Sequence, residues 1–128
     1  MRPLPDPEKA KPIILVVDDD EAVTAALKAR LGRDFRVIGV NDPRQAVAMA
    51  RSEQPDVILC DIKMFGMQGD EVAYALSQDE FTAEIPLIYL TSLVGDTAEL
   101  DGPFGGHLAI SKSASADELL EVIHDALG

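Results

Sequence analysis

The sequence contains little cysteine, few basic residues and no long apolar run. Its single cysteine excludes an intrachain disulfide and suits a reducing compartment. Only 11 lysines and arginines stand against 23 aspartates and glutamates, and the net charge of −12 argues against nucleic acid or an anionic membrane as a partner. No apolar stretch is long enough to cross a bilayer, and the first residues lack the apolar core of a signal peptide. We therefore expect a soluble, cytoplasmic protein.

The chain has enough apolar residues for one compact domain. Its 128 residues are 47% hydrophobic, which allows a proper core and leaves little chain for a second domain. Residues 1–12 carry four prolines among mostly polar residues, which is typical of a flexible leader. We therefore expect a single folded domain at residues 13–128.

Short apolar runs alternate with helical patterns along this domain. The runs have the length of strands, and they lie at residues 13–17, 35–40, 57–60, 85–90 and 108–110. Alternation of this kind predicts an α/β fold with a parallel sheet, right-handed crossovers and helices on both faces. Between the fourth and fifth strands, the glycine-rich segment 93–106 leaves room for at most a short or irregular helix.

Acidic residues follow two of the expected strands. Asp18, Asp19 and Asp20 come directly after the first strand, and Asp61 follows the third. Because parallel strands end at one edge of a sheet, these carboxylates should lie close together and repel one another. A hard divalent cation such as Mg²⁺ would relieve that repulsion. We expect Asp19 and Asp61 to bind it, helped by the backbone carbonyl of Lys63.

Two further polar groups follow the remaining strands of the same edge. Thr91 ends the fourth strand, and Lys112 comes just after the fifth. In this setting Asp61 could attack a phosphorus atom, while Thr91 and Lys112 bind the phosphoryl oxygens. Taken singly, each residue has a plainer role, such as capping a helix or ending a strand. The prediction of chemistry therefore depends on all of them together.

In this combination the sequence resembles the receiver domain of two-component response regulators, over roughly residues 13–128. That family has an acidic pair after the first strand, a phosphoaccepting aspartate after the third, a Thr or Ser after the fourth and a Lys after the fifth. The residues at those positions here are Asp18, Asp19, Asp61, Thr91 and Lys112. The resemblance implies a flavodoxin-like, doubly wound, five-stranded sheet in the order 2-1-3-4-5. It also implies a Mg²⁺ site made by Asp18, Asp19, Asp61 and the Lys63 carbonyl.

The resemblance further implies a signalling function. A sensor histidine kinase or a histidine phosphotransfer protein would phosphorylate Asp61 in the presence of Mg²⁺, and a downstream protein would respond to the phosphorylated form. The domain would assist its own phosphorylation and dephosphorylation without being an enzyme for a separate substrate. No effector domain follows the last expected helix, so output is by direct protein contacts or the chain is one piece of a longer protein.

Three departures from the family pattern leave other functions open. Ser113 stands where the family usually has a proline after a cis peptide, so the Lys112–Ser113 bond can be cis or trans. Ala109 stands where an aromatic reporter of phosphorylation is common, and Phe65 replaces a loop proline. These departures suit an adaptor that binds partners without a phosphorylation switch. A small aspartyl phosphatase is a third alternative, although Lys63 occupies the position of its usual general acid.

Overall fold

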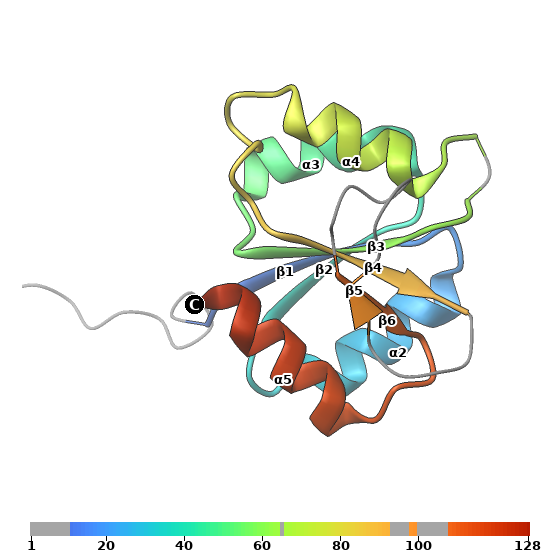
Figure 1. The fold of residues 1–128 in the computed structure, drawn as a ribbon, viewed down its shortest axis with the longest axis vertical. Helices are drawn as coiled ribbons and strands as arrows, with labels where there is room; N and C mark the ends of the chain where they lie inside the picture. The colour runs from blue at the N-terminus through green and yellow to red at the C-terminus, as the bar shows by residue number, and fades with distance from the viewer. Residues whose placement is uncertain (1–10, 65, 93–97, 100–107) are drawn as a thin grey trace, which may run out of the picture.

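The computed structural model describes residues 11–64, 66–92 and 108–128, and the backbone alone at residues 98–99. Within these ranges the chain forms a six-stranded sheet in the order β2-β1-β3-β4-β6-β5 (Figure 1). The strands are β1 (Ile13–Val17), β2 (Arg36–Val40), β3 (Val57–Asp61), β4 (Leu87–Thr91), β5 (Ala98–Glu99) and β6 (Leu108–Ser111). The helices are α2 (Glu21–Leu31), the 3-10 turn η1 (Pro43–Gln45), α3 (Ala46–Glu53), α4 (Gly69–Ser77) and α5 (Ala116–Leu127).

Five of the strands run parallel. β1 pairs with β2 and β3, β3 pairs with β4, and β4 pairs with β6. This confirms the expected α/β fold and, when only the parallel strands are numbered, the order 2-1-3-4-5. The sixth strand, β5, pairs antiparallel with β6, and its two residues are too few to leave a pattern in the sequence. Apart from β5, the segment 93–106, where we expected a short or irregular helix, lies outside the described residues.

Helices cover both faces of the sheet, α3 and α4 on one side and α2 and α5 on the other (Figure 1). Successive side chains of β1 point to opposite faces: Leu15 and Val17 join the core under α3 and α4, and Val16 joins the core under α2 and α5. Every residue of β3 is buried as well. Burial on both faces explains why these two strands are apolar throughout, and it fixes the edge where they end.

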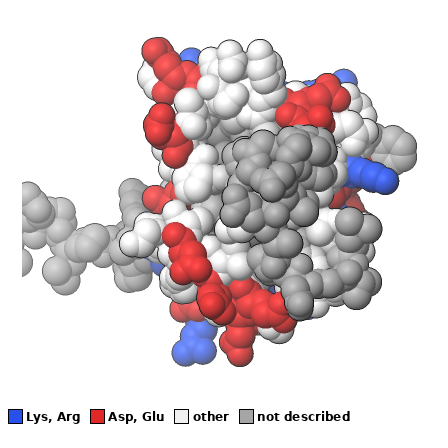
Figure 2. Space-filling model, viewed as in Figure 1, with Lys and Arg blue, Asp and Glu red and all other residues white. Residues whose placement is uncertain are grey.

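Acidic side chains outnumber basic ones on the face drawn in Figure 2, in line with the net charge of −12. None of the helices in the described ranges combines the length and the apolar composition that a bilayer span requires.

Most of the expected leader, residues 1–10, lies outside the described residues, so the domain boundary stays a prediction. The carbonyl of Pro12 accepts a hydrogen bond from the Arg36 N–H at 2.9 Å, so hydrogen bonding to β2 begins one residue ahead of β1.

Candidate functional site

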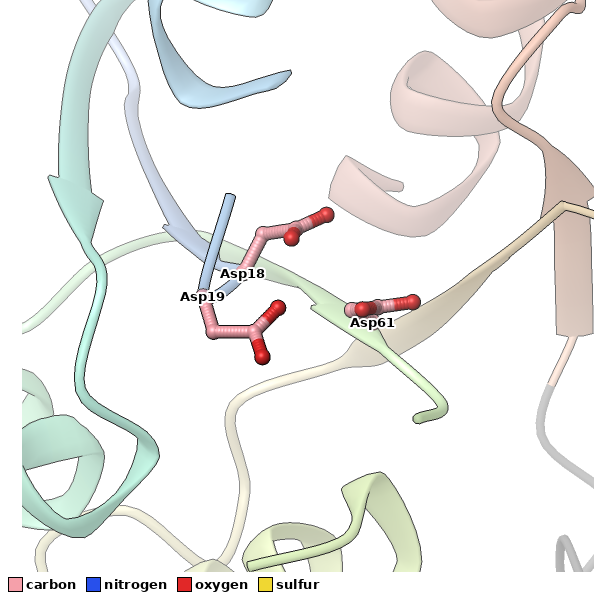
Figure 3. A group of neighbouring side chains, drawn as sticks. All are labelled: Asp18, Asp19 and Asp61. Carbon is pink, nitrogen blue, oxygen red and sulfur yellow. The ribbon is translucent and has the colours of Figure 1, made fainter. Parts of the chain in front are cut away.

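Three carboxylates meet where β1 and β3 end (Figure 3). Asp18 and Asp19 directly follow β1, and Asp61 is the last residue of β3. The two strands are paired in parallel up to Val17 and Cys60, so the acids that come next emerge side by side. One carboxylate oxygen from each of Asp18, Asp19 and Asp61 lies within 4.8 Å of the other two. The carboxylates thus lie together, as the sequence predicts.

Backbone and side-chain hydrogen bonds hold Asp18 in place, and its side chain is fully buried. The Asp18 N–H donates to the Val40 carbonyl at 3.0 Å, and the Asp20 N–H donates to Asp18 Oδ1 at 2.9 Å. Asn41 Nδ2 donates to the Asp18 carbonyl at 2.9 Å. Sequence reasoning missed Asn41. The signal that could have found it is the one used for the acids, because Asn41 is the polar residue that follows β2 at this same edge.

Lys112 brings a positive charge to this group. Its Nζ lies 2.9 Å from Asp18 Oδ2 and 3.1 Å from Asp61 Oδ1. The side chains of Asp18, Asp61 and Lys112 are 0%, 9% and 25% exposed, so water screens these ion pairs less than it screens pairs on the open surface. The backbone of Lys112 is tied to β4, because its N–H donates to the Thr91 carbonyl at 2.8 Å. The expected phosphoacceptor and the expected lysine are therefore in direct contact.

The surroundings shift proton affinities in the site. Burial and the charge of Asp18 raise the pKa of Asp61 above its ordinary value, although Lys112 opposes the shift. Burial favours the neutral amine of Lys112, but the ion pairs with Asp18 and Asp61 together outweigh burial and raise the pKa of the ammonium. Burial also raises the pKa of the neighbouring Cys60 thiol, which therefore stays neutral and acts as a small core residue.

The charges and spacing of the site fit a divalent cation. Three carboxylates and one ammonium leave two negative charges uncompensated. Among the described residues no donor reaches Asp18 Oδ2 in hydrogen-bonding geometry, and its contact is the ion pair with Lys112. Oxygens on opposite sides of Mg²⁺ lie about 4.2 Å apart, twice the usual bond length. A cluster within 4.8 Å therefore needs only small side-chain adjustments to hold the ion.

The other two expected site residues lie at the border of this cluster. Lys63 is exposed, two residues beyond β3, and it lines an open groove together with Asp19, Met64 and Gln68. Thr91 is half-buried at the end of β4, and its register partner in β6 is Ser111. Both residues lie on the edge where the sequence predicts them. Their roles, a carbonyl ligand and a phosphoryl-binding hydroxyl, stay predictions.

Gly69 lets the loop after β3 close tightly behind Asp61. A Cβ at this position would lie 2.4 Å from the Asp61 carbonyl oxygen and 2.9 Å from the Ile62 Cα. The Gly69 N–H donates to the Ile62 carbonyl at 2.8 Å, and α4 begins at this residue. Only glycine fits here without moving the backbone of Asp61 and Ile62.

The structure shows the conformation at two of the departures from the family pattern, Ser113 and Ala109. No cis peptide occurs in the part of the chain that is described, so the Lys112–Ser113 bond is trans. Ala109 is the register partner of Tyr89, and both belong to the core under α3 and α4. Tyr89 is 1% exposed, and burial raises its pKa to about 12. At this register pair the aromatic residue is therefore on β4, and the small residue is on β6.

Comparison with known proteins identifies the family of this chain. The model of the response regulator receiver domain matches residues 14–124. The response regulator PleD of Caulobacter vibrioides is 36% identical over 115 residues, which are 89% of this chain and 24% of PleD. The protein PilH of Pseudomonas aeruginosa is 33% identical over 116 residues, which are 89% of this chain and 96% of PilH. The chain thus spans about a quarter of PleD and nearly all of PilH.

The fold of this chain is also similar to that of a solved structure. The receiver domain of the sensor histidine kinase PA1611 from Pseudomonas aeruginosa aligns with a TM-score of 0.79 and 26% identity. The alignment covers 93% of this chain and 99% of that one. In that structure a magnesium ion is coordinated in the active site cleft.

Proposed function

Because the chain belongs to the response regulator receiver domains, we propose that Asp61 is its phosphoacceptor. The observation that carries this proposal is the position of the Lys112 ammonium, 2.9 Å from Asp18 Oδ2 and 3.1 Å from Asp61 Oδ1. The Asp61 side chain keeps some exposure, whereas Asp18 has none. That difference favours Asp61 for attack on a donor and Asp18 for balancing charge.

In the proposed reaction, an oxygen of Asp61 attacks the phosphorus of a phosphohistidine on the donor. The P–N bond breaks, its electron pair goes to the imidazole, which takes up a proton, and Asp61 becomes an acyl phosphate. Lys112 moves its contact from the carboxylate to a phosphoryl oxygen, and Thr91 binds another. Mg²⁺, held by Asp18, Asp19, Asp61 and the Lys63 carbonyl, supplies the remaining charge neutralisation when bound.

The proposed partners are proteins. We expect a sensor histidine kinase or a histidine phosphotransfer protein as donor and a downstream protein as target, both in the cytoplasm. The similarity to the receiver domain of a sensor histidine kinase supports the donor. The net charge of −12 disfavours nucleic acid as a target of this chain. The domain would catalyse no turnover of a separate substrate.

The proposal is tested with a small phosphodonor. The protein is incubated with acetyl phosphate, with and without Mg²⁺, and its intact mass is measured. We expect one added phosphoryl group that depends on Mg²⁺ and is absent from Asp61→Asn. Asp125→Asn, which removes an exposed carboxylate from α5, should label like the wild type. An unlabelled wild type, or a labelled Asp61→Asn variant, would contradict the proposal.

A second candidate function is an adaptor that binds partners in one state only. The observation that favours it is the pairing of Ala109, which has no rotamer to change, with the enclosed Tyr89. Partner capture with phosphorylated and unphosphorylated protein separates the two functions. Equal binding of a downstream protein by both forms would favour the adaptor.

A further inference from the structure

The turn that carries Lys112 is closed by a serine hydroxyl. Ser111 ends β6 and is 8% exposed. Its Oγ accepts a hydrogen bond from the Ser113 N–H at 3.1 Å and forms a second with the Ser113 hydroxyl at 2.8 Å. The Ala114 N–H donates to the Ser111 carbonyl at 3.0 Å. Lys112 therefore sits inside a turn that both the backbone and the side chain of Ser111 close.

The turn acts together with the sheet to direct Lys112. On its amino-terminal side, Lys112 is fixed by the hydrogen bond from its own N–H to the Thr91 carbonyl at 2.8 Å. On its carboxy-terminal side, the equivalent constraint is the bond from the Ser113 N–H to Ser111 Oγ. These two bonds hold the backbone on either side of the Lys112 Cα. They thereby set the direction in which the long side chain starts toward Asp18 and Asp61.

Packing alone does not restrict the lysine. Ser111 and Lys112 line a largely apolar cavity of about 200 Å³ between α2 and α5, together with Leu27, Leu90 and Leu119. Because this space lies beside the aliphatic stem, packing against neighbours does not by itself select one rotamer of Lys112. The position of the ammonium is therefore set by its two ion pairs and by the turn, which fixes where the side chain starts.

We propose that Ser111 is a positioning residue: its hydroxyl closes the 111–114 turn and thereby holds the Lys112 ammonium between Asp18 and Asp61. The kinetic consequence of this proposal rests on the proposed function, but the position of the ammonium does not. Ser111 itself touches no reacting atom. It affects phosphoryl transfer only by positioning the Lys112 ammonium.

The first test observes the lysine directly and needs no phosphorylation. An ammonium held by two carboxylates exchanges its protons slowly, so a ¹⁵N NMR resonance of Lys112 Nζ should be visible in the wild type. We expect the resonance to be lost in Ser111→Ala, which removes the acceptor for the Ser113 N–H, and kept in Ser111→Thr, which retains a hydroxyl. An unchanged Lys112 resonance in Ser111→Ala would overturn the proposal, whether or not Asp61 can be phosphorylated.

The second test measures coupling between Ser111 and Lys112. We expect Ser111→Ala to slow phosphorylation by acetyl phosphate about tenfold, because a displaced ammonium stabilises the transferring group less well. Ser111→Thr should stay within about twofold of the wild type. In a Lys112→Ala background, Ser111→Ala should have no further effect, since the residue through which it acts is gone.

A matched control separates positioning from general destabilisation. Ser115→Ala removes the hydroxyl that caps α5, where Ser115 Oγ accepts the Glu118 N–H at 3.2 Å. It should lower stability in urea without slowing phosphorylation at saturating acetyl phosphate and Mg²⁺. If Ser111→Ala slows the reaction no more than Ser115→Ala, or slows it equally in the Lys112→Ala background, Ser111 has only a structural role and the proposal is wrong. A wild type that is never labelled would refute the proposed function and leave the NMR result to decide this one.

Discussion

The site has two halves that are built differently. The acidic half, Asp18, Asp19 and Asp61, follows β1 and β3, two strands that are paired on both sides and buried on both faces. The lysine half consists of Thr91 and Ser111, the last residues of β4 and β6, and of Lys112, which follows in a loop shaped by two serine hydroxyls. The positions of the acids are therefore set by buried strands of the core, whereas the position of Lys112 depends on a short turn.

The departures from the family pattern in the described residues bear mostly on the lysine half. Ser113 follows the lysine directly, and Ala109 pairs with Tyr89 just ahead of Thr91 and Ser111. The acidic half keeps the acids that the family pattern requires. Replacing an acid in that half should be costly, because each carboxylate there offsets the charge of Lys112 and of the proposed Mg²⁺. The two halves thus differ in how closely they follow the family pattern: the acids match it, and the described departures lie near Thr91 and Lys112.

Removing the lysine should have the largest effect. We expect Lys112→Ala to slow phosphorylation by acetyl phosphate about a hundredfold, because the ammonium no longer stabilises the transferring group. The same change should tighten Mg²⁺ binding, measured by calorimetry, since the site then carries one more uncompensated negative charge. Lys28→Ala removes an exposed lysine from α2 and is the matched control. Weaker Mg²⁺ binding in Lys112→Ala would contradict the assignment of charges.

Crowding the backbone of Asp61 should disturb the acidic half. Gly69→Ala places a methyl group where the Asp61 carbonyl oxygen lies 2.4 Å away. We expect a loss of about 2 kcal/mol in the free energy of unfolding, measured in urea. Ser77→Ala, an exposed change in the same helix, should stay within about 0.5 kcal/mol of the wild type. Equal stability of the two variants would show that the loop relaxes without cost.

Much of the acidic half could be predicted from the sequence, because its information is local. An apolar run that ends in an acid gives both the buried strand and the place of its carboxylate, as Asp18 and Asp61 demonstrate. The alternation of strands and helices predicted the parallel sheet, whereas its strand order was implied by the resemblance to receiver domains. Asn41 was not predicted, because a single uncharged amide after β2 does not form a charged group as the acids do.

The lysine half was harder to predict, because its structure depends on contacts between neighbours. The bond from the Ser113 N–H to Ser111 Oγ is a feature of one turn and leaves no periodic signal. The strand β5 has only two residues and exists through its antiparallel pairing with β6. The contact of Lys112 with Asp18, as well as with Asp61, also depends on side-chain directions that spacing does not give.

Whether the side chains of Ala109 and Tyr89 share space can be tested by exchanging the small and the aromatic residue between the two positions. Ala109→Phe alone should overpack the core and lower the free energy of unfolding by about 1–3 kcal/mol. Combining it with Tyr89→Ala should cost less than the sum of the two single changes, because the two positions are register partners. Urea unfolding of the four proteins in the cycle gives the coupling. Strict additivity would show that the two side chains do not share space.

The dependence of stability on pH should reveal the crowding of carboxylates, as the smallest of these effects. The pKa of Asp61 is raised in the folded protein, so the folded state holds this proton more tightly than the unfolded chain does. The contribution of Asp61 to stability should therefore fall as pH rises from its ordinary pKa of about 4 through the raised value. The difference between wild type and Asp61→Asn, measured by urea unfolding across pH, isolates this effect. A difference that does not vary with pH would contradict the raised pKa.

A crystal structure of the protein grown with Mg²⁺ tests the central claim most directly. We predict one ion, bound by oxygens of Asp18, Asp19, Asp61 and the Lys63 carbonyl at about 2.1 Å. Lys112 should remain within reach of Asp61, ready to contact an incoming phosphoryl group. An ion bound elsewhere, or a saturating Mg²⁺ concentration that leaves these carboxylates without metal, would contradict the account.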